Sequence, residues 1–298
     1  MKTRRIIVEK HYYLMMLPGM LWLVLFSIVP MSGIIMAFQD YNPGKGIFRS
    51  KWIGMENFRY LMQLDDSKQV IINTLVISVG KIIFNLLVSL VFALMLNEIR
   101  NLKYKKFVQT VVFLPHFISW VVMSTIVIGV FGYTGVINAI MGWFGREPYL
   151  FMADASIFRQ LVIGTEVWKE FGYNAVIFLA ALTSINPNLY EAAAIDGANR
   201  LQSTWYITLP GLASTIVLLG VLSLGNVLNA GFDQVYNLYN PLVYSTGDIL
   251  DTWIYRLGLQ NLQYSLATAA GLFKSAVSFI MIAVSYILAY KFADYKVF

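Results

Sequence analysis

A short polar stripe interrupts one of the long apolar runs of this sequence. Glu166, Lys169, Glu170 and Tyr173 lie three and four residues apart, so on a helix they share one face. Such charges are costly inside a membrane and usually face protein or water. One interpretation is a solute path, in which the carboxylates and Tyr173 hydrogen-bond solute hydroxyl groups. The other is local pairing of Lys169 with Glu166 or Glu170, packed on a neighbouring subunit.

Two further pairs of polar residues stand in apolar surroundings. Lys81 and Asn85 are four residues apart and form a weaker stripe of the same kind. Asn226 and Asn229 fall within the apolar stretch 211–230, where we expect them to face a central seam. These four residues join the first stripe as candidate pathway residues.

The other isolated polar residues predict packing rather than chemistry. His116 follows Pro115, so we expect it to pack at a helix kink, and Lys274 is expected to extend from the outer end of its apolar segment to the membrane interface. The chain has no cysteine and two histidines, too few for a histidine-built zinc site. We predict no metal site and no catalytic residues.

The composition indicates a membrane protein. Of 298 residues, 58% are hydrophobic and 13% are charged, more apolar surface than a soluble domain can bury. The net charge of +6 comes with no nucleic-acid motif, so no nucleic-acid partner is predicted. The apolar run near the amino terminus is too long for a signal peptide and is interpreted as a retained membrane span.

Six apolar segments approach the roughly 20 helical residues that cross a bilayer core. They are Leu14–Phe38, Val70–Leu96, Phe107–Phe131, Leu161–Thr183, Gly211–Ala230 and Leu272–Tyr290. Without the short alternating segments of a barrel, each must be helical. We therefore predict an all-α, six-helix membrane protein in which residues 1–298 form a single domain. Pro30 and Pro115 are predicted to kink their helices rather than end them.

The distribution of Lys and Arg predicts the orientation. With the amino terminus in the cytoplasm, the inside segments hold 11 basic residues in 58, whereas the outside loops hold 8 in 101. Both termini are therefore predicted to be cytoplasmic. The outside loops 39–69, 132–160 and 231–271 either receive a partner, form a vestibule for the solute or merely connect the spans. The first of them is itself basic.

The polar stretch EAAAIDGANRLQSTWYITLP, residues 191–210, lies on the cytoplasmic side in this orientation. We predict a short helix capped by Asn188, a break at Gly197 and a second short helix leading to Pro210 in the first turn of the next span. Physical reasoning leaves two interpretations. The stretch is a docking elbow that another protein approaches closely, or an amphipathic helix lying on the membrane.

This stretch resembles the EAA loop of permease subunits of bacterial binding-protein-dependent ABC importers. The resemblance rests on Glu191-Ala192-Ala193, on Asp196-Gly197-Ala198 and on Ile207-x-Leu209-Pro210. The sequence TGDILDTWIYRLGLQNLQYSLATAAGLFKS is similar to the oligosaccharide and polysaccharide branch of the carbohydrate-uptake permeases, and the resemblance covers most of the chain.

The resemblance implies a type I importer permease fold and a cytoplasmic coupling loop at 187–210. It implies that the ATPase contact is made by Glu191, Ala192, Ala193, Asp196, Gly197, Ala198, Leu209 and Pro210. It also implies five kinds of partner: a second permease subunit, two ATP-binding subunits, an extracellular solute-binding protein, a carbohydrate and membrane lipid. The expected location is the bacterial cytoplasmic membrane.

The chain has no G-x-x-x-x-G-K-[ST] sequence, so it cannot hydrolyse ATP through a P-loop. No cofactor is expected in this chain, and ATP and Mg are expected on the partner ATPase. Two other classes of function are weaker. A secondary transporter driven by an ion gradient is compatible with the Glu/Lys stripe but has no use for the elbow. A membrane-embedded enzyme lacks any catalytic set in the sequence.

Overall fold

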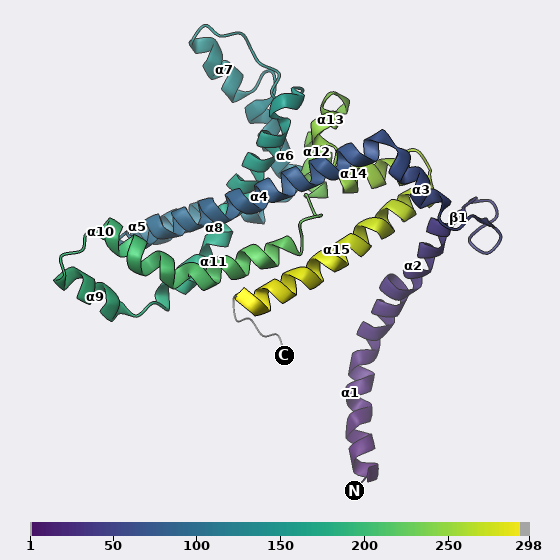
Figure 1. The fold of residues 1–298 in the computed structure, drawn as a ribbon, viewed down its shortest axis with the longest axis horizontal. Coiled ribbons are helices and arrows are strands. Elements are labelled where there is room, and N and C mark those ends of the chain that lie inside the picture. The colour runs from purple at the N-terminus through teal and green to yellow at the C-terminus, as the bar shows by residue number, and fades with distance from the viewer. Residues whose placement is uncertain (1, 293–298) are drawn as a thin grey trace. The chain divides into compact units, whose positions relative to one another are not determined.

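The computed structural model describes residues 2–292, and the side chains of residues 10–291, as a set of helices with one small strand pair (Figure 1). The α-helices are α1 (Lys2–Leu23), α2 (Val29–Met31), α3 (Glu56–Gln63), α4 (Asp65–Asn97), α5 (Leu102–Phe113), α6 (Trp120–Phe131), α7 (Val136–Trp143), α8 (Ala155–Thr183), α9 (Pro187–Ile195), α10 (Arg200–Ser203), α11 (Leu209–Leu224), α12 (Phe232–Leu238), α13 (Tyr244–Gly247), α14 (Leu250–Tyr255) and α15 (Tyr264–Phe292). Short π-helical or 3-10 turns are η1 (Val24–Ile28), η2 (Ser32–Phe38), η3 (Leu114–Phe117), η4 (Thr204–Thr208), η5 (Pro241–Val243) and η6 (Arg256–Gln260), and the strands are β1 (Gln39–Asp40) and β2 (Lys51–Trp52).

The described chain forms two compact units. One comprises residues 2–64 and 254–273, and the other comprises residues 65–253 and 274–292. In the first unit, β1 pairs with β2 in antiparallel register, Gln39 opposite Trp52 and Asp40 opposite Lys51. The ring of Phe38 stacks on Trp52 with centroids 5.6 Å apart, which secures the strand pair at its edge.

The second unit is built around the parallel pair of long helices α4 and α8, which run side by side in Figure 1. Gly80 of α4 permits their close approach, because a Cβ at this position would lie 2.5 Å from the Ile163 side chain of α8. Gly172 plays the same part against α5, since its Cβ would lie 2.5 Å from the Val112 carbonyl oxygen. Close-packed apolar clusters then fill the space around α8.

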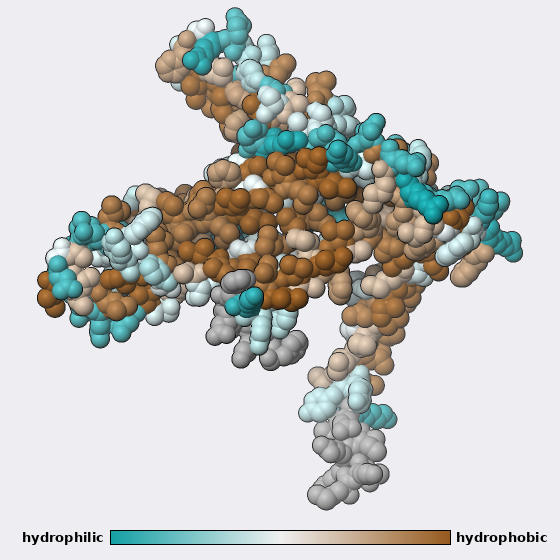
Figure 2. Space-filling model, viewed as in Figure 1, coloured by the Kyte–Doolittle hydropathy of each residue, from teal (hydrophilic) through white to brown (hydrophobic). Residues whose placement is uncertain are grey.

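Five helical segments of the described chain are long and apolar enough to cross a membrane. They are Lys10–Phe38, Asp65–Asn97, Trp120–Trp143, Arg200–Leu224 and Tyr264–Lys291. Figure 2 shows wide brown, hydrophobic surface over the long helices, as expected of side chains that meet lipid. The predicted span Leu161–Thr183 is also helical, within the 29-residue α8, but its charges keep it out of this set.

The prediction of one continuous helix over Phe107–Phe131 is wrong. The structure ends α5 at Phe113, inserts η3 and begins α6 at Trp120. Pro115 lies in η3, and the chain is extended at Ile118 and at Ser119, whose side chain caps α6. Pro115 lacks the N–H that would continue α5, and Ser119 offers a new start.

The other spans are helical, but several begin earlier than predicted, with α8 starting at Ala155 instead of residue 161 and α15 at Tyr264 instead of residue 272. Through Pro30 the helical run continues, with η1 preceding the proline, as the kink prediction required. The fifth span ends earlier than predicted, at Leu224 instead of residue 230. Asn226 and Asn229 therefore lie in the turn after α11 and not on its helical face.

Candidate functional site

A cavity of about 250 Å³ opens in the second unit, between α4, α8 and α11. Five of the predicted pathway residues line it: Lys81, Asn85, Glu166, Asn226 and Asn229. Its other polar lining residues, which sequence reasoning missed, are Ser78, Ser89, Asn174 and Ser223. Amides and hydroxyls outnumber charges around this cavity, so its wall offers many hydrogen-bond donors and acceptors.

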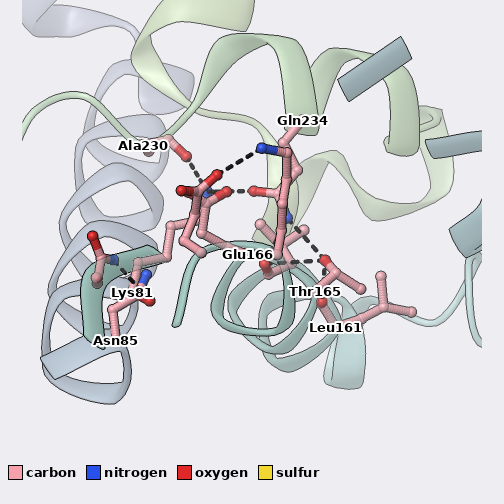
Figure 3. Close-up of polar contacts among 11 residues, drawn as sticks. Lys81, Asn85, Leu161, Thr165, Glu166, Ala230 and Gln234 are labelled. Carbon is pink, nitrogen blue, oxygen red and sulfur yellow. Dashed lines mark hydrogen bonds and ion pairs between the residues drawn. The ribbon is translucent and has the colours of Figure 1, made fainter. Parts of the chain in front are cut away.

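Lys81 is the centre of the polar contacts beside this cavity (Figure 3). Its ammonium group donates to the Ala230 carbonyl oxygen at 2.6 Å and to the Gln234 side-chain oxygen, and lies 3.6 Å from the Glu166 carboxylate. The Lys81 side chain is 9% exposed and that of Glu166 is 21% exposed. A buried ammonium group is tolerated because its donors are satisfied in this way.

Gln234 is the functional residue that the sequence reasoning missed entirely. It is fully buried on α12, and its amide nitrogen donates to the Val162 carbonyl at 2.7 Å and to the Thr165 hydroxyl at 2.8 Å, both on α8. It thereby joins Lys81 of α4 to α8. Neither periodicity nor a motif marks Gln234 in the sequence, because its role depends on partners about 70 and 150 residues away along the chain.

Gly231 makes this arrangement possible at the start of α12. Its φ is +89°, a left-handed conformation that favours glycine. In addition, a Cβ at this position would lie 2.9 Å from the Lys81 ammonium nitrogen. The positive φ is the main reason for glycine in the turn after α11, since an added Cβ would meet only the flexible end of the Lys81 side chain.

The predicted stripe on α8 divides between two places. Lys169 and Glu170 turn to the break between α5 and α6, where Lys169 donates to the His116 carbonyl at 2.9 Å and to Glu170 at 2.6 Å. The His116 imidazole lies 2.6 Å from Glu170 and stacks on Tyr173, with centroids 3.9 Å apart and planes 2° apart. The predicted local pair of Lys169 with Glu170 is confirmed, whereas Glu166 pairs with Lys81 instead of Lys169.

Lys274 also departs from its prediction. Its ammonium group forms an ion pair with Asp251 instead of extending alone to the membrane interface. Both side chains are about one-fifth exposed, so the pair removes two charges from apolar surroundings. Among the described residues, no group of three His, Asp or Glu side chains could hold a metal ion.

The stretch 187–210 folds into the predicted helix, break and second helix. The capping residue differs from the prediction: Asn186, not Asn188, caps α9, and its side chain accepts from the Asn188 N–H at 3.0 Å. Asn186 precedes Pro187 at the first helical position, which is the favoured arrangement. Gly197 ends the helix with φ +80°, and the Ala198 N–H bonds back to the Ala193 carbonyl at 2.9 Å.

The second half of this stretch continues without interruption into a membrane helix. Asn199 and Gln202 form a capping box at the start of α10. The helical run then passes through η4 into α11, where Pro210 occupies the first turn. The Tyr190 hydroxyl lies 3.0 Å from the Thr208 hydroxyl and so ties α9 to this run. We call residues 187–210 the elbow.

The elbow exposes large apolar side chains. Ile195 is 87% exposed, and Leu201, Trp205 and Tyr206 are 78%, 65% and 75% exposed. Glu191, Ala192, Asp196 and Gly197 are exposed as well, as is Pro210, whereas Ala193, Ala198 and Leu209 are partly buried. In Figure 2, brown and teal surface lie side by side where α9 and α10 are labelled in Figure 1. Such a mixed patch is typical of a protein interaction site.

Comparison with known proteins agrees with this architecture. The family model described as "Binding-protein-dependent transport system inner membrane component" matches residues 85–294. The chain belongs to this family. The prediction of a non-enzymatic transport subunit that spans the bacterial cytoplasmic membrane several times is therefore confirmed.

Relatives of this permease are similar over nearly the whole chain. It is 42% identical to the polygalacturonan/rhamnogalacturonan transport system permease protein YteP of Bacillus subtilis (strain 168) over 97% of this chain and 91% of YteP. One chain in a crystal structure of a bacterial ABC transporter involved in the import of the acidic polysaccharide alginate is 38% identical to this permease. The TM-score is 0.87, with 97% of this permease and 98% of that chain covered. A second structure of the alginate transporter, in complex with a periplasmic protein that holds an alginate pentasaccharide, gives a TM-score of 0.87 at 37% identity, with 99% of each chain covered.

Proposed function

We propose that this permease is one half of the translocation pathway of an ATP-driven importer for oligosaccharides or polysaccharide fragments. Two similar systems are named for polygalacturonan/rhamnogalacturonan and for alginate, so the proposed cargo is a saccharide that carries acid groups. The cavity beside Lys81 supports this class of cargo, because amides and hydroxyls suit saccharide hydroxyl groups.

The proposed topology has six spans with both termini in the cytoplasm. It adds α8, the fourth span in chain order, to the five apolar segments despite the charges of α8. These charges have partners inside the unit: Glu166 meets Lys81, Glu170 meets His116, and Arg159 donates to Asn73 at 2.6 Å. Paired charges directed at neighbouring helices are compatible with a helix in a membrane.

The observation that carries the mechanism is the exposed elbow. In the proposed assembly a separate ATPase, which binds ATP and Mg, docks on Glu191, Ala192, Ala193, Asp196, Gly197 and Ala198. Leu209 and Pro210 lie where the elbow enters α11. Because α10, η4 and α11 form one helical run, displacement of the elbow is transmitted into the membrane. The complete importer would include a second related permease, two ATPases and an extracellular solute-binding protein.

Two glycine substitutions test this coupling. Gly197 and Gly145 both have positive φ, +80° and +70°, and a Cβ on either would meet nothing within 4 Å. Gly197→Ala and Gly145→Ala therefore carry the same backbone strain, about 1–2 kcal/mol. We expect saccharide-stimulated ATP hydrolysis and uptake in proteoliposomes to fall sharply in the first variant and to be nearly unchanged in the second.

Equal activity of the two variants would refute coupling through the elbow. The secondary-transporter alternative predicts that an ion gradient, and not ATP hydrolysis, drives transport. If an ion gradient drove saccharide uptake by this chain without ATPase subunits, that alternative would be established and the proposed mechanism excluded.

A further inference from the structure

A cleft of about 580 Å³ lies within the first unit and shares no lining residue with the cavity beside Lys81. It is formed by Asp40 and Tyr41 after the first span, by α3, and by residues 262–266 at the start of α15. Its volume is within the range of sites for small ligands. The predicted orientation places these segments in the first and third outside loops, on the side from which a solute arrives.

One face of α3 supplies four of the thirteen residues that line this cleft. Glu56, Arg59, Tyr60 and Gln63 all line it, at spacings of three and four residues. These spacings put the four side chains in a row on a helix. The row combines a carboxylate, a guanidinium, a phenol and an amide, so it contains both donors and acceptors.

Two buried residues of α3 fix this row in place, and one of them, Asn57, also lines the cleft. Leu61 is buried, and so is Asn57, whose amide donates to the Ala37 carbonyl at 2.9 Å and to the Gln39 carbonyl at 3.0 Å. These bonds attach α3 to the end of the first span and to β1. The row of four side chains is therefore held in a fixed position rather than carried on a free loop.

The other wall of the cleft is also fixed. The Tyr41 N–H donates to the Ser265 hydroxyl at 2.9 Å, and the rings of Tyr41 and Tyr264 meet edge to face at 6.0 Å. Leu262, in the same wall, has φ +57° and is the one non-glycine residue with positive φ among those described. Strained backbone of this kind concentrates at binding sites, where the surrounding structure holds it.

The chemistry of the lining identifies the class of ligand. In the described part of the chain, the side chains of Glu56, Arg59 and Gln63 form no hydrogen bond or ion pair, although all three line the cleft. Glutamate is depleted at protein–protein interfaces whereas tyrosine and arginine are enriched there, so a protein partner is the alternative that the test distinguishes. A saccharide ring fits well, because its hydroxyl groups engage carboxylate, guanidinium and amide while its apolar face packs on tyrosine.

We infer that this cleft is a saccharide-binding site on the outer side of the permease, separate from the cavity beside Lys81. The ligand class rests on the proposed function, but the site requires neither ATP hydrolysis nor the solute-binding protein. It would hold one end of the arriving saccharide by its hydroxyl groups, with Tyr60 and the Glu56 carboxylate as the central contacts.

The test uses the assembled permease and ATPase complex in nanodiscs, without nucleotide and without the solute-binding protein. The probes are a galacturonate trimer and a neutral galactose trimer, and binding is measured by saturation-transfer NMR titration. We expect at least one trimer to bind. Tyr60→Ala and Glu56→Gln should each weaken its binding about fivefold or more, which corresponds to the loss of one hydrogen bond or packing contact.

Phe48→Ala is the matched control, because Phe48 belongs to the same unit and is 99% exposed outside the cleft. Its Kd should stay within about twofold of the parent value. Thermal unfolding confirms that each variant is folded, and Glu56→Gln preserves side-chain shape if Tyr60→Ala is unstable. Failure of both trimers to bind, or binding that neither variant weakens, would overturn the inference. So would variants that bind saccharide normally but lose the solute-binding protein, which would make the cleft a protein docking surface.

Discussion

The cavity beside Lys81 and the elbow both contain polar residues in an otherwise apolar chain, but they differ in how far their side chains are buried and bonded within the permease. Beside the cavity, Lys81 of α4 and Gln234 of α12 are buried and bonded to each other, and Gln234 also donates to α8. At the elbow, Ile195 and Leu201 are largely exposed. The first arrangement supports the fold, and the second leaves binding capacity for another protein. Substitutions should therefore affect stability at the cavity and assembly at the elbow.

The largest effect is expected from Lys81→Met. This substitution leaves the Glu166 carboxylate and the Gln234 side-chain oxygen without their partner, and breaking a buried pair costs about 3–5 kcal/mol. The thermal midpoint of the purified complex should fall accordingly. The double variant Lys81→Met with Glu166→Leu should recover part of the loss, since the charge has been removed with its partner. Additive losses would show that the two side chains are not coupled.

Gly172→Val is expected to have the next largest effect on stability. The added side chain would meet the Val112 backbone carbonyl at 2.5 Å, and backbone gives way less readily than a flexible side chain. Overpacking of this kind costs about 1–3 kcal/mol. Gly164→Val on the same helix is the matched control, because a Cβ there meets nothing within 4 Å. Equal thermal midpoints of the two variants would contradict the close packing of α5 on α8.

Ile195→Ser and Leu201→Ser should weaken binding of the ATPase and leave the stability of the permease nearly unchanged, the opposite of the effect at the cavity. Both side chains are more than three-quarters exposed, so the stability of the permease should change by no more than about 0.5 kcal/mol. Copurification of the ATPase should nevertheless decrease. Phe144→Ser, at a side chain that is 79% exposed but outside the elbow, should leave copurification intact. A loss of thermal stability without loss of the ATPase would assign these residues to the fold.

The smallest effect is expected at the ion pair between Arg200 and Glu98, which joins the elbow to the end of α4 at 2.9 Å. Both side chains are more than half exposed, so a double-mutant cycle of Arg200→Gln and Glu98→Gln should give a coupling free energy of about 0.2–1 kcal/mol. High salt should reduce it. A much larger value would mean that this pair, rather than the helical run, holds the elbow in place.

Low pH is expected to reduce stability through Asp154, which caps the start of α8. Asp154 accepts hydrogen bonds from the Ser156 N–H and hydroxyl, both at 2.7 Å, and these bonds hold the pKa of its carboxyl below the usual range. A lowered pKa in the folded state means that the stabilisation is present above the ordinary carboxyl pKa and is lost as the pH falls through the lowered value. Asp154→Asn should flatten this acid limb of stability, measured by thermal unfolding against pH. An unchanged limb would show that other carboxylates dominate.

The sequence predicted the features that depend on nearby residues. The apolar lengths located most of the spans, and Asp196-Gly197 located the bend of the elbow, because both depend on local conformational preference. Local rules also failed in places. Pro30 and Pro115 are both followed by a serine, but Ser32 stays helical and its hydroxyl donates to the Val29 carbonyl. Ser119 instead has an extended backbone and caps α6, so the helix ends only after Pro115.

The distant contacts were beyond a single sequence. The spacing of Glu166, Lys169, Glu170 and Tyr173 indicated one shared face, but it contained no information on which neighbour each side chain would meet. Lys81 of α4 captures Glu166, and His116 captures Glu170. Gln234 was missed because its importance arises only when α12 folds back between α4 and α8.

Single-cysteine crosslinking tests the central claim most directly, because the chain has no cysteine of its own. Ile195→Cys places a thiol on the elbow, and Phe144→Cys places one on the predicted outer side. In the assembled complex, we predict that Ile195→Cys crosslinks to the ATPase, with a yield that changes on addition of ATP. Phe144→Cys should form no such crosslink and should react with a membrane-impermeant reagent from outside. A crosslink from Phe144→Cys, or none from Ile195→Cys, would contradict both the orientation and the coupling role of the elbow.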